Sequence, residues 1–301
     1  MPSPTDAGHK NRSVRHLSGL NSQSAYTVFM QSKDYIPWYV SPKSKCQLSD
    51  FDTEPSSKVL PSVSALDDHL VDMGEKLNKL QSTLHAAKSK GLLVVFQGMD
   101  TAGKDGVIRS VFSHVSPLGV RAEAFGVPTE LESRHDFLWR IHAKAPARGE
   151  MVIFNRSHYE DVLVTRVRGL IDEKTCQQRY DNILHFESLL QDAGITVLKC
   201  YLHISKSEQK KRLQARLDDP RKHWKLQPSD FEDRELWPQF TQAYEEALSA
   251  TSTPESPWYV VPADSKPYRD SFVAGLIVQT LENMKLKTPK PTFDLSKVKL
   301  S

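Results

Sequence analysis

A glycine-rich segment, residues 98–106, has the residue types and spacing that could hold a phosphate group. It reads GMDTAGKDG, so Gly98 to Lys104 fits the pattern G-x-x-x-x-G-K. An apolar run precedes it and a segment of helical period follows it, which is the context in which this pattern binds phosphate. Glycines let backbone N–H groups approach a phosphate, a helix N-terminus adds positive potential, and the lysine ammonium neutralises oxygens. Rather than an ordinary turn with a solvated lysine, we predict phosphate contacts from Gly98, Ala102, Gly103, Asp105 and Gly106.

The position after the loop lysine departs from the usual pattern. Ser or Thr commonly stands there and binds Mg²⁺, whereas this chain has Asp105. The metal must then be held by another residue, and Asp100 inside the loop is the candidate. A carboxylate among phosphate-binding amides would be repelled by phosphate unless a cation lay between them. We therefore assign Asp100 to Mg²⁺, with Mn²⁺ as an alternative ion; the other explanation is an Asp that stabilises the turn.

A second group of polar residues follows the apolar run 151–154 and reads NRSHYED over residues 155–161. Strand ends of a parallel sheet are where ligands gather. Arg156 could form paired hydrogen bonds with phosphate oxygens, and Glu160 and Asp161 could act as a base or as metal ligands. Glu160 has an equally good alternative, because Ser157-x-x-Glu160 is also the spacing of a helix capping box. On spacing alone, either explanation fits.

A basic segment lies near residues 206–225. Arg212 and Arg216 are four residues apart and share one helix face, and Pro220 ends that helix. We interpret residues 205–235 as a helical lid that closes on phosphates and excludes water. The alternatives are a solvated helix face and a nucleic-acid site. The basic residues are Lys206, Lys210, Lys211, Arg212, Arg216, Arg221, Lys222, His223 and Lys225.

The elements that must position these residues alternate between short apolar runs and segments of helical period. Strands are expected at 92–96, 121–125, 151–154, 195–202 and 258–261. Helices are expected at 64–88, with Ser64 and Asp67 as its cap, and at 105–115, 130–144, 157–168, 172–192, 205–218, 229–249 and 265–286. This alternation predicts an α/β protein with a parallel sheet covered on both faces.

Composition narrows the class of protein. The chain has 301 residues, 39% of them apolar, a net charge of +3 and three widely separated cysteines. This predicts a reducing, cytoplasmic setting without a disulfide framework, and no membrane partner because no apolar run approaches ~20 residues. We expect a disordered tail at 1–34, an arm and helix at 35–90, a core at 91–287 and a loose tail at 288–301.

The motifs together resemble the polyphosphate kinase 2 family. They are residues 98–106, Pro128-Thr129, HDFLWR at 135–140 and FNRSHYEDVL at 154–163, and the likeness extends from about residue 45 to 285. The resemblance implies a thymidylate-kinase-like, three-layer α/β/α P-loop kinase fold with a basic helical lid. It also implies phosphoryl transfer between inorganic polyphosphate and purine nucleotides with Mg²⁺. The Asp at 105 is then a family trait.

The resemblance also implies roles for individual residues. Asp100, Lys104, Arg156, Glu160 and Asp161 are the expected catalytic residues, with Asp100 and Asp161 as metal ligands. We expect Arg212, Arg216 and Lys222 to bind phosphates, and Asn155, Glu160 and Arg166 to contact the nucleotide. Many members carry Asp where this chain has Asn155; the Asn form resembles the subgroup that acts on nucleoside mono- and diphosphates.

The hypothesis is an in-line transfer from polyphosphate to a nucleotide by an enzyme that forms homo-oligomers and binds no nucleic acid. The nearest alternative is an ATP-dependent nucleotide or small-molecule kinase with the same fold. A non-catalytic nucleic-acid or scaffold protein would not need the loop lysine at 104.

Overall fold

The computed structural model describes residues 38–54 and 62–298. The tail expected at 1–34 lies outside the described residues. The segment 38–54 packs along one edge of the sheet, where the Val40 N–H donates to the Trp258 carbonyl at 2.8 Å. In the described part of the chain, no helix is long and apolar enough to cross a membrane.

A single parallel sheet forms the middle of the molecule. The described residues contain the five strands β1 (Gly91–Gln97), β2 (Val120–Ala124), β3 (Met151–Asn155), β4 (Ile195–His203) and β5 (Trp258–Pro262), in the order β2-β3-β1-β4-β5. The register places Val94 of β1 between Ile153 and Leu198. Every residue of β1 is buried, which explains its continuous apolar run. All five expected strands are confirmed.

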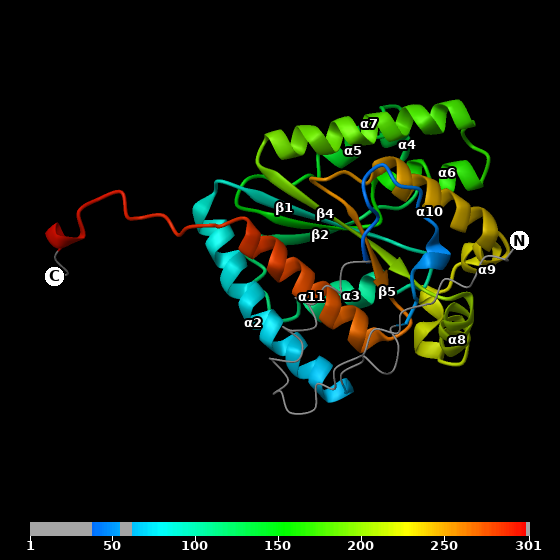
Figure 1. Ribbon diagram of the computed structural model, residues 1–301, viewed down its shortest axis with the longest axis horizontal. Helices are drawn as coiled ribbons and strands as arrows, with labels where there is room; N and C mark the ends of the chain where they lie inside the picture. Colours follow the sequence, from blue (N-terminus) through cyan, green and yellow to red (C-terminus); the bar gives the residue numbers. More distant parts are fainter. Residues whose placement is uncertain (1–37, 55–61, 299–301) are drawn as a thin grey trace, which may run out of the picture.

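Helices cover both faces of the sheet, which gives three layers (Figure 1). One layer contains α2 (Val63–Ala87), α3 (Lys104–Val111) and α11 (Lys266–Asn283), and α11 packs against the other two. The opposite layer contains α7 (Glu173–Asp192) and α10 (Trp237–Thr251). The three-layer α/β/α architecture expected from the resemblance is therefore present.

Three expected helices are broken into shorter pieces. The segment 130–144 forms α4 (Glu130–Ser133) and α5 (Trp139–His142), and 157–168 forms the 3-10 helix η3 (His158–Asp161) and α6 (Val164–Val167). The expected helix 229–249 is two helices, α9 (Pro228–Glu235) and α10, because Pro238 lacks an N–H and occupies the first turn of α10. The cap of α2 is Ser62 rather than Ser64, since the Ser62 hydroxyl accepts the Ala65 N–H at 3.2 Å.

The basic segment lies beyond the carboxyl ends of the strands (Figure 1). It consists of α8 (Lys206–Leu217), the 3-10 helix η4 (Pro220–Lys225) and α9. Ser205 caps α8 by accepting the Glu208 N–H at 3.1 Å. We call residues 205–235 the lid segment. After α11, residues 288–298 extend from the body of the molecule and contain the short 3-10 helix η5 (Leu295–Lys297).

Candidate active site

The glycine-rich loop joins β1 to α3 at the carboxyl edge of the sheet. Gly103 precedes α3 with φ +106°, a conformation that L side chains rarely adopt. The guanidinium of Arg269 from α11 lies against it, because a Cβ built on Gly103 would be 1.9 Å from Arg269 Nη1. Glycine is therefore required here both by the backbone angle and by a close approach.

Lys104 is buried and turns back onto its own loop. Its Nζ donates to the Gly98 carbonyl at 2.7 Å and to the Met99 carbonyl at 3.3 Å. Burial lowers the pKa of Lys104, as does the charge of Arg156, although neighbouring carboxylates oppose both effects. An ammonium held by carbonyls at this position can exchange those partners for phosphate oxygens without a large movement of the backbone.

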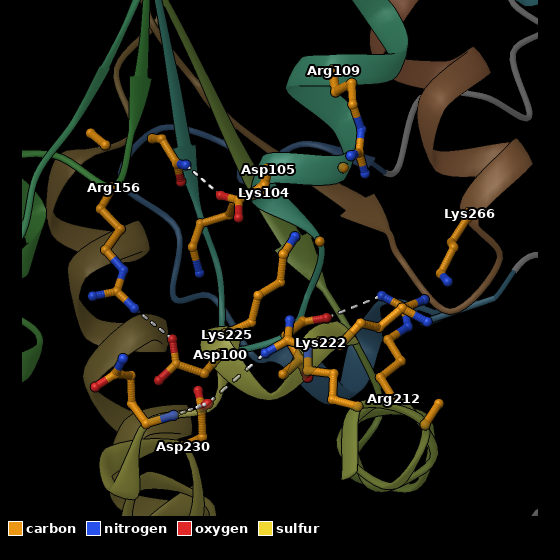
Figure 2. A pocket seen from close by; sticks show the side chains of 18 of the residues that line it. Asp100, Lys104, Asp105, Arg109, Arg156, Arg212, Lys222, Lys225, Asp230 and Lys266 are labelled. Atoms are coloured by element: carbon orange, nitrogen blue, oxygen red, sulfur yellow. Dashed lines mark hydrogen bonds and ion pairs between the residues drawn. The ribbon is translucent and has the colours of Figure 1, made fainter. Parts of the chain in front are cut away.

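Asp100 and Arg156 meet across the gap between the ends of β1 and β3 (Figure 2). Arg156 Nη2 donates to Asp100 Oδ1 at 2.7 Å. Burial works against ionisation of Asp100, but Lys104 and Arg156 outweigh it and lower the pKa of this carboxyl. Asp233 of α9 lies beside Asp100, and burial together with the Asp100 charge raises the pKa of Asp233. An ionised carboxylate therefore faces a second carboxyl that arrives from the lid segment.

The unusual Asp105 has a specific partner. Asn155, at the end of β3, donates through Nδ2 to Asp105 Oδ1 at 2.6 Å (Figure 2). An Asp at position 155 would place two carboxylates in contact, which would need a proton or a cation between them. The unusual carboxylate of Asp105 and the amide of Asn155 thus form one hydrogen-bonded pair.

Glu160 does not form the capping box that its spacing allowed, so that explanation is wrong. The Ser157 hydroxyl accepts the Tyr159 N–H at 3.2 Å instead. The Glu160 side chain is half-buried, and its partial removal from water raises the carboxyl pKa although the charges of Arg156 and Lys104 oppose this. The tertiary structure therefore turns Glu160 towards the loop lysine and the strand-end arginine.

Asp161 faces two arginines on the other side of the same turn. Its carboxylate lies 3.6 Å from Arg140 Nη2 and 3.8 Å from Arg179 Nη1. Burial raises the pKa of Asp161, against the effect of Arg140. Asp161 Oδ2 is the oxygen nearest Arg140, so a metal ion at this carboxylate would share it with an arginine.

Two cavities of different chemistry open at this edge of the sheet. The first measures about 820 Å³, and its described lining carries ten Lys and Arg side chains against four carboxylates. The second measures about 270 Å³ and has apolar walls that include Val127, Leu170 and Phe240. Four residues line both cavities, namely Asp100, Phe125, Gly126 and Arg156. The Asp100–Arg156 pair therefore stands where the two cavities meet.

The structure brings most of the expected site residues together. Arg212, Arg216 and Lys222 of the lid segment line the first cavity, and Glu160 and Asp161 line the second. Arg212 is nearly buried and donates to the Ala102 carbonyl at 3.0 Å, so it supports the loop from outside. Ala102 itself is buried and is not among the described residues that line either cavity.

Arg166 is placed differently from the expectation of a nucleotide contact. It pairs with Glu173 at 2.7 Å and with Glu246, and it is not among the described residues that line either cavity. Arg168, two residues later, does line the second cavity and pairs with Asp233 and Glu232 of α9. Of these two arginines, Arg168 is the one that lines the second cavity, and the nucleotide contact expected of Arg166 stays a prediction.

Sequence reasoning missed several cavity residues. Lys266 and Arg269 reach the first cavity from the start of α11, and Arg140 reaches the second from α5. Lys266 and Arg269 belong to no motif, whereas Arg140 ends the HDFLWR motif at 135–140 but had been assigned no role. The one available signal was that Lys266 and Arg269 follow the end of a strand, where ligands of parallel sheets gather.

Comparisons with known proteins agree in sequence and in fold. A family model described as polyphosphate kinase 2 matches residues 62–289. The AMP/ADP-polyphosphate phosphotransferase of Meiothermus ruber is 47% identical over 259 residues, which cover 86% of this chain and 97% of that protein. The ADP-polyphosphate phosphotransferase of Rhodopseudomonas palustris is 41% identical over 230 residues, which cover 72% and 80%. The crystal structure of polyphosphate kinase 2 from Arthrobacter aurescens TC1 superposes with a TM-score of 0.83 at 40% identity, covering 88% of this chain and 94% of that one.

Proposed function

Because the chain belongs to the polyphosphate kinase 2 family, we propose that it is a polyphosphate-dependent nucleotide kinase. It transfers a phosphoryl group between inorganic polyphosphate and nucleoside mono- or diphosphates. The observation that carries this proposal is the meeting of a large basic cavity with a smaller, partly apolar one at Asp100 and Arg156. One cavity suits a chain of phosphates and the other suits a nucleoside.

The basic cavity fits a polyanion that has no base to recognise. Its cations come from four separate parts of the chain, namely α3, the turn after β3, the lid segment and the start of α11, so they surround the space rather than form one stripe (Figure 2). Lys222 and Lys225 of the lid segment and Lys266 of α11 are examples of this spread. A low-dielectric cleft lined by one sign of charge raises the local concentration of an oppositely charged substrate.

The second cavity fits the nucleotide. Val127, Leu170 and Phe240 supply apolar surface of the kind that a nucleobase packs against, and Arg140 and Arg168 supply donors. Because Arg156 lines both cavities, its guanidinium is placed to contact the phosphates of both substrates. Purine selection would then depend on the walls of this cavity and not on the polyphosphate channel.

We infer Mg²⁺ as the metal of the reaction, with Mn²⁺ as the alternative ion. Asp100 is ionised, and the Asp233 carboxyl lies beside it with a raised pKa, an arrangement that a divalent cation would relieve. Carboxylate oxygens are hard ligands of the type that Mg²⁺ prefers. We place the metal against Asp100 and keep Asp161 as the second expected ligand, although its carboxylate pairs with Arg140 and Arg179 in this structure. When bound, the ion would neutralise charge on the transferring phosphoryl group.

The chain's own residues then position the two substrates. A terminal phosphate oxygen of the nucleotide attacks the end phosphorus of polyphosphate; a new P–O bond forms, the bridging P–O bond breaks, and the polyphosphate leaves one unit shorter. Lys104 exchanges its loop carbonyls for phosphate oxygens, and Arg156 holds both phosphates in line. Glu160 orients the acceptor end of the nucleotide. Phosphoryl transfer needs mainly such positioning and charge stabilisation.

A direct assay tests the proposal. Purified protein is supplied with Mg²⁺, polyphosphate and ADP in the absence of ATP, and ATP formation is followed. AMP, GMP and GDP are compared as acceptors in parallel. ATP formation that disappears when polyphosphate is left out is the expected result. Failure to form ATP, together with ATP-driven phosphorylation of another acceptor, would instead establish an ATP-dependent kinase.

A further inference from the structure

A buried polar cluster lies behind the turn that carries Glu160 and Asp161. It consists of Glu187 on α7, Lys199 on β4, and His158 and Tyr159 of η3, all with side chains at most 2% exposed. None of the four is among the described residues that line either cavity. The cluster therefore has no direct access to substrate.

Glu187 is the hub of this cluster. Its Oε2 accepts from Lys199 Nζ at 2.6 Å, and its Oε1 accepts from the Tyr159 hydroxyl at 2.7 Å. His158 Nε2 lies 3.5 Å from Oε1. Burial works against the charged form of Glu187, but the charge of Lys199 outweighs it and lowers the pKa to about 2. Glu187 is therefore an ionised carboxylate, and the hydrogen bond that it accepts from the Tyr159 hydroxyl is strong.

Lys199 connects the cluster to a second helix, α10. Its Nζ also donates to the Thr251 carbonyl at the end of α10, at 2.7 Å. The Tyr159 ring packs edge-on against Trp258 of β5, with ring centroids 4.8 Å apart. One buried pair thus connects α7, β4 and α10 to a single turn beside the active site.

Fold stability alone does not explain such a pair. Two opposite charges taken out of water lose about as much hydration free energy as their attraction returns, and apolar residues of similar size often serve the fold equally well. A buried, fully hydrogen-bonded pair does fix geometry, because each donor has one acceptable position. Here the pair fixes the position of η3, a turn of four residues. The last two of them, Glu160 and Asp161, line the second cavity.

We propose that Glu187 and Lys199 are positioning residues for phosphoryl transfer, which hold Tyr159 and through it set the placement of Glu160 and Asp161. The activity part of this inference rests on the proposed function. Neither residue touches substrate, so the pair acts on the rate of transfer and not on the binding of polyphosphate. A displacement of reacting groups by about 1 Å can cost on the order of 10²-fold in rate.

Two variants test the proposal without leaving a buried charge unpaired. Tyr159→Phe removes only the hydroxyl that reaches Glu187. The double variant Glu187→Leu with Lys199→Met removes both charges and keeps the volume filled, so it should fold. Tyr180→Phe is the matched control, because this buried tyrosine lies on α7 like Glu187, but its hydroxyl interacts with Cys176 and not with the Glu187 cluster.

We expect kcat to fall roughly 3- to 10-fold in Tyr159→Phe and about 10- to 100-fold in the double variant. The KM for polyphosphate should stay within about twofold, since no cation of the first cavity belongs to the network. Hydrogen exchange of backbone amides 157–163 should rise in the double variant and remain unchanged at residues 98–106. Tyr180→Phe should match the wild-type chain in both measurements.

The outcomes are separable. A folded double variant with wild-type kcat, or with unchanged exchange at 157–163, overturns the positioning role. A wild-type chain that makes no ATP from polyphosphate refutes the proposed function, and the exchange measurement then decides alone whether the pair holds the turn. A fall in kcat with intact KM and raised exchange supports both.

Discussion

Replacement of Gly103 by Ala should destabilise the phosphate loop for two separate reasons, the backbone angle and a close contact with Arg269. Gly103 has φ +106°, and holding a non-glycine residue in such a region costs about 1–3 kcal/mol. The new Cβ would also lie 1.9 Å from Arg269 Nη1, so the guanidinium must move. Arg269 is buried and donates to Asp270 Oδ1 at 2.8 Å through Nε, and weakening a charged hydrogen bond costs about 1.5–3 kcal/mol more. The expected loss of unfolding free energy is therefore roughly 2.5–6 kcal/mol.

Gly106→Ala provides the matched control in the same segment. Gly106 lies in the first turn of α3, and a methyl group added there would meet only the tip of Arg269, at 3.3 Å from Nη2. This variant should be as stable as the wild-type chain or more stable, by up to about 1 kcal/mol, because Ala favours helix. Denaturant unfolding of all three proteins measures the difference, and steady-state kinetics with polyphosphate should show a loss on the order of 10²-fold in kcat/KM for Gly103→Ala.

Two results would contradict this account of the loop. If Gly103→Ala unfolds within about 0.5 kcal/mol of the wild-type chain, then the backbone angle and the contact with Arg269 do not constrain the loop. If Gly106→Ala is destabilised equally, then any added methyl group disturbs the segment and the two specific causes given for Gly103 are wrong.

Three further predictions concern charge. Lys104→Met should lower kcat by roughly 10²–10⁴, since a cation on the transferring phosphate is lost; an unchanged kcat would remove Lys104 from the reaction. Lys222→Gln should raise the KM for polyphosphate and make that KM less dependent on salt, because a cation of the first cavity is lost. Lys210→Gln is the control: Lys210 is exposed in the same segment but is not among the described residues that line the cavity. Kinetics measured over a range of salt concentrations should show neither effect for Lys210→Gln. Burial raises the pKa of Glu160 above its ordinary value of 4.5, so the folded chain keeps this proton to a higher pH than the unfolded chain does. The folded state therefore loses stability as the pH rises from 4.5 through the pKa of the folded chain. Glu160→Gln should therefore gain unfolding free energy relative to the wild-type chain at pH 7 but not near pH 4, and an equal gain at both values would contradict the burial of this carboxyl.

Much of the fold could be predicted from local pattern. The apolar runs at 92–96 and 195–202 became β1 and β4 within a residue or two, because a strand buried on both faces needs a continuous apolar run whatever surrounds it. The glycine-rich loop was equally readable, since its spacing and its strand–helix context are contained in nine consecutive residues. The helix breaks at 134–138 and near Pro238 were not predicted, because the helical spacing of apolar residues continues across both breaks. The first break contains the Asp136 side chain, which accepts the Leu138 N–H, and the second contains a proline.

The chemistry around the loop was only partly readable. Ser157 and Glu160 satisfy the spacing of a capping box, and sequence alone could not choose between that role and a place in the site. In the packed fold the capping box does not form, because Ser157 accepts the Tyr159 N–H and Glu160 lies near Lys104 and Arg156. In the same way Arg168, and not Arg166, came to line the second cavity.

Local sequence was enough to specify the strand–helix alternation and the phosphate loop with its lysine. It was also enough to show the two unusual residues, Asp105 after the loop lysine and Asn155 at the end of a strand. These depend on neighbours a few residues away, and backbone sterics and apolar periodicity act over that range. Folding in three dimensions was needed to place Arg269 against a loop carbonyl 167 residues away and to set Asp233 beside Asp100. It also buried Glu187 with Lys199 behind the turn that carries Glu160 and Asp161. Such contacts arise when whole helices pack on the sheet, and packing depends on the combined shape of many side chains rather than on any local spacing.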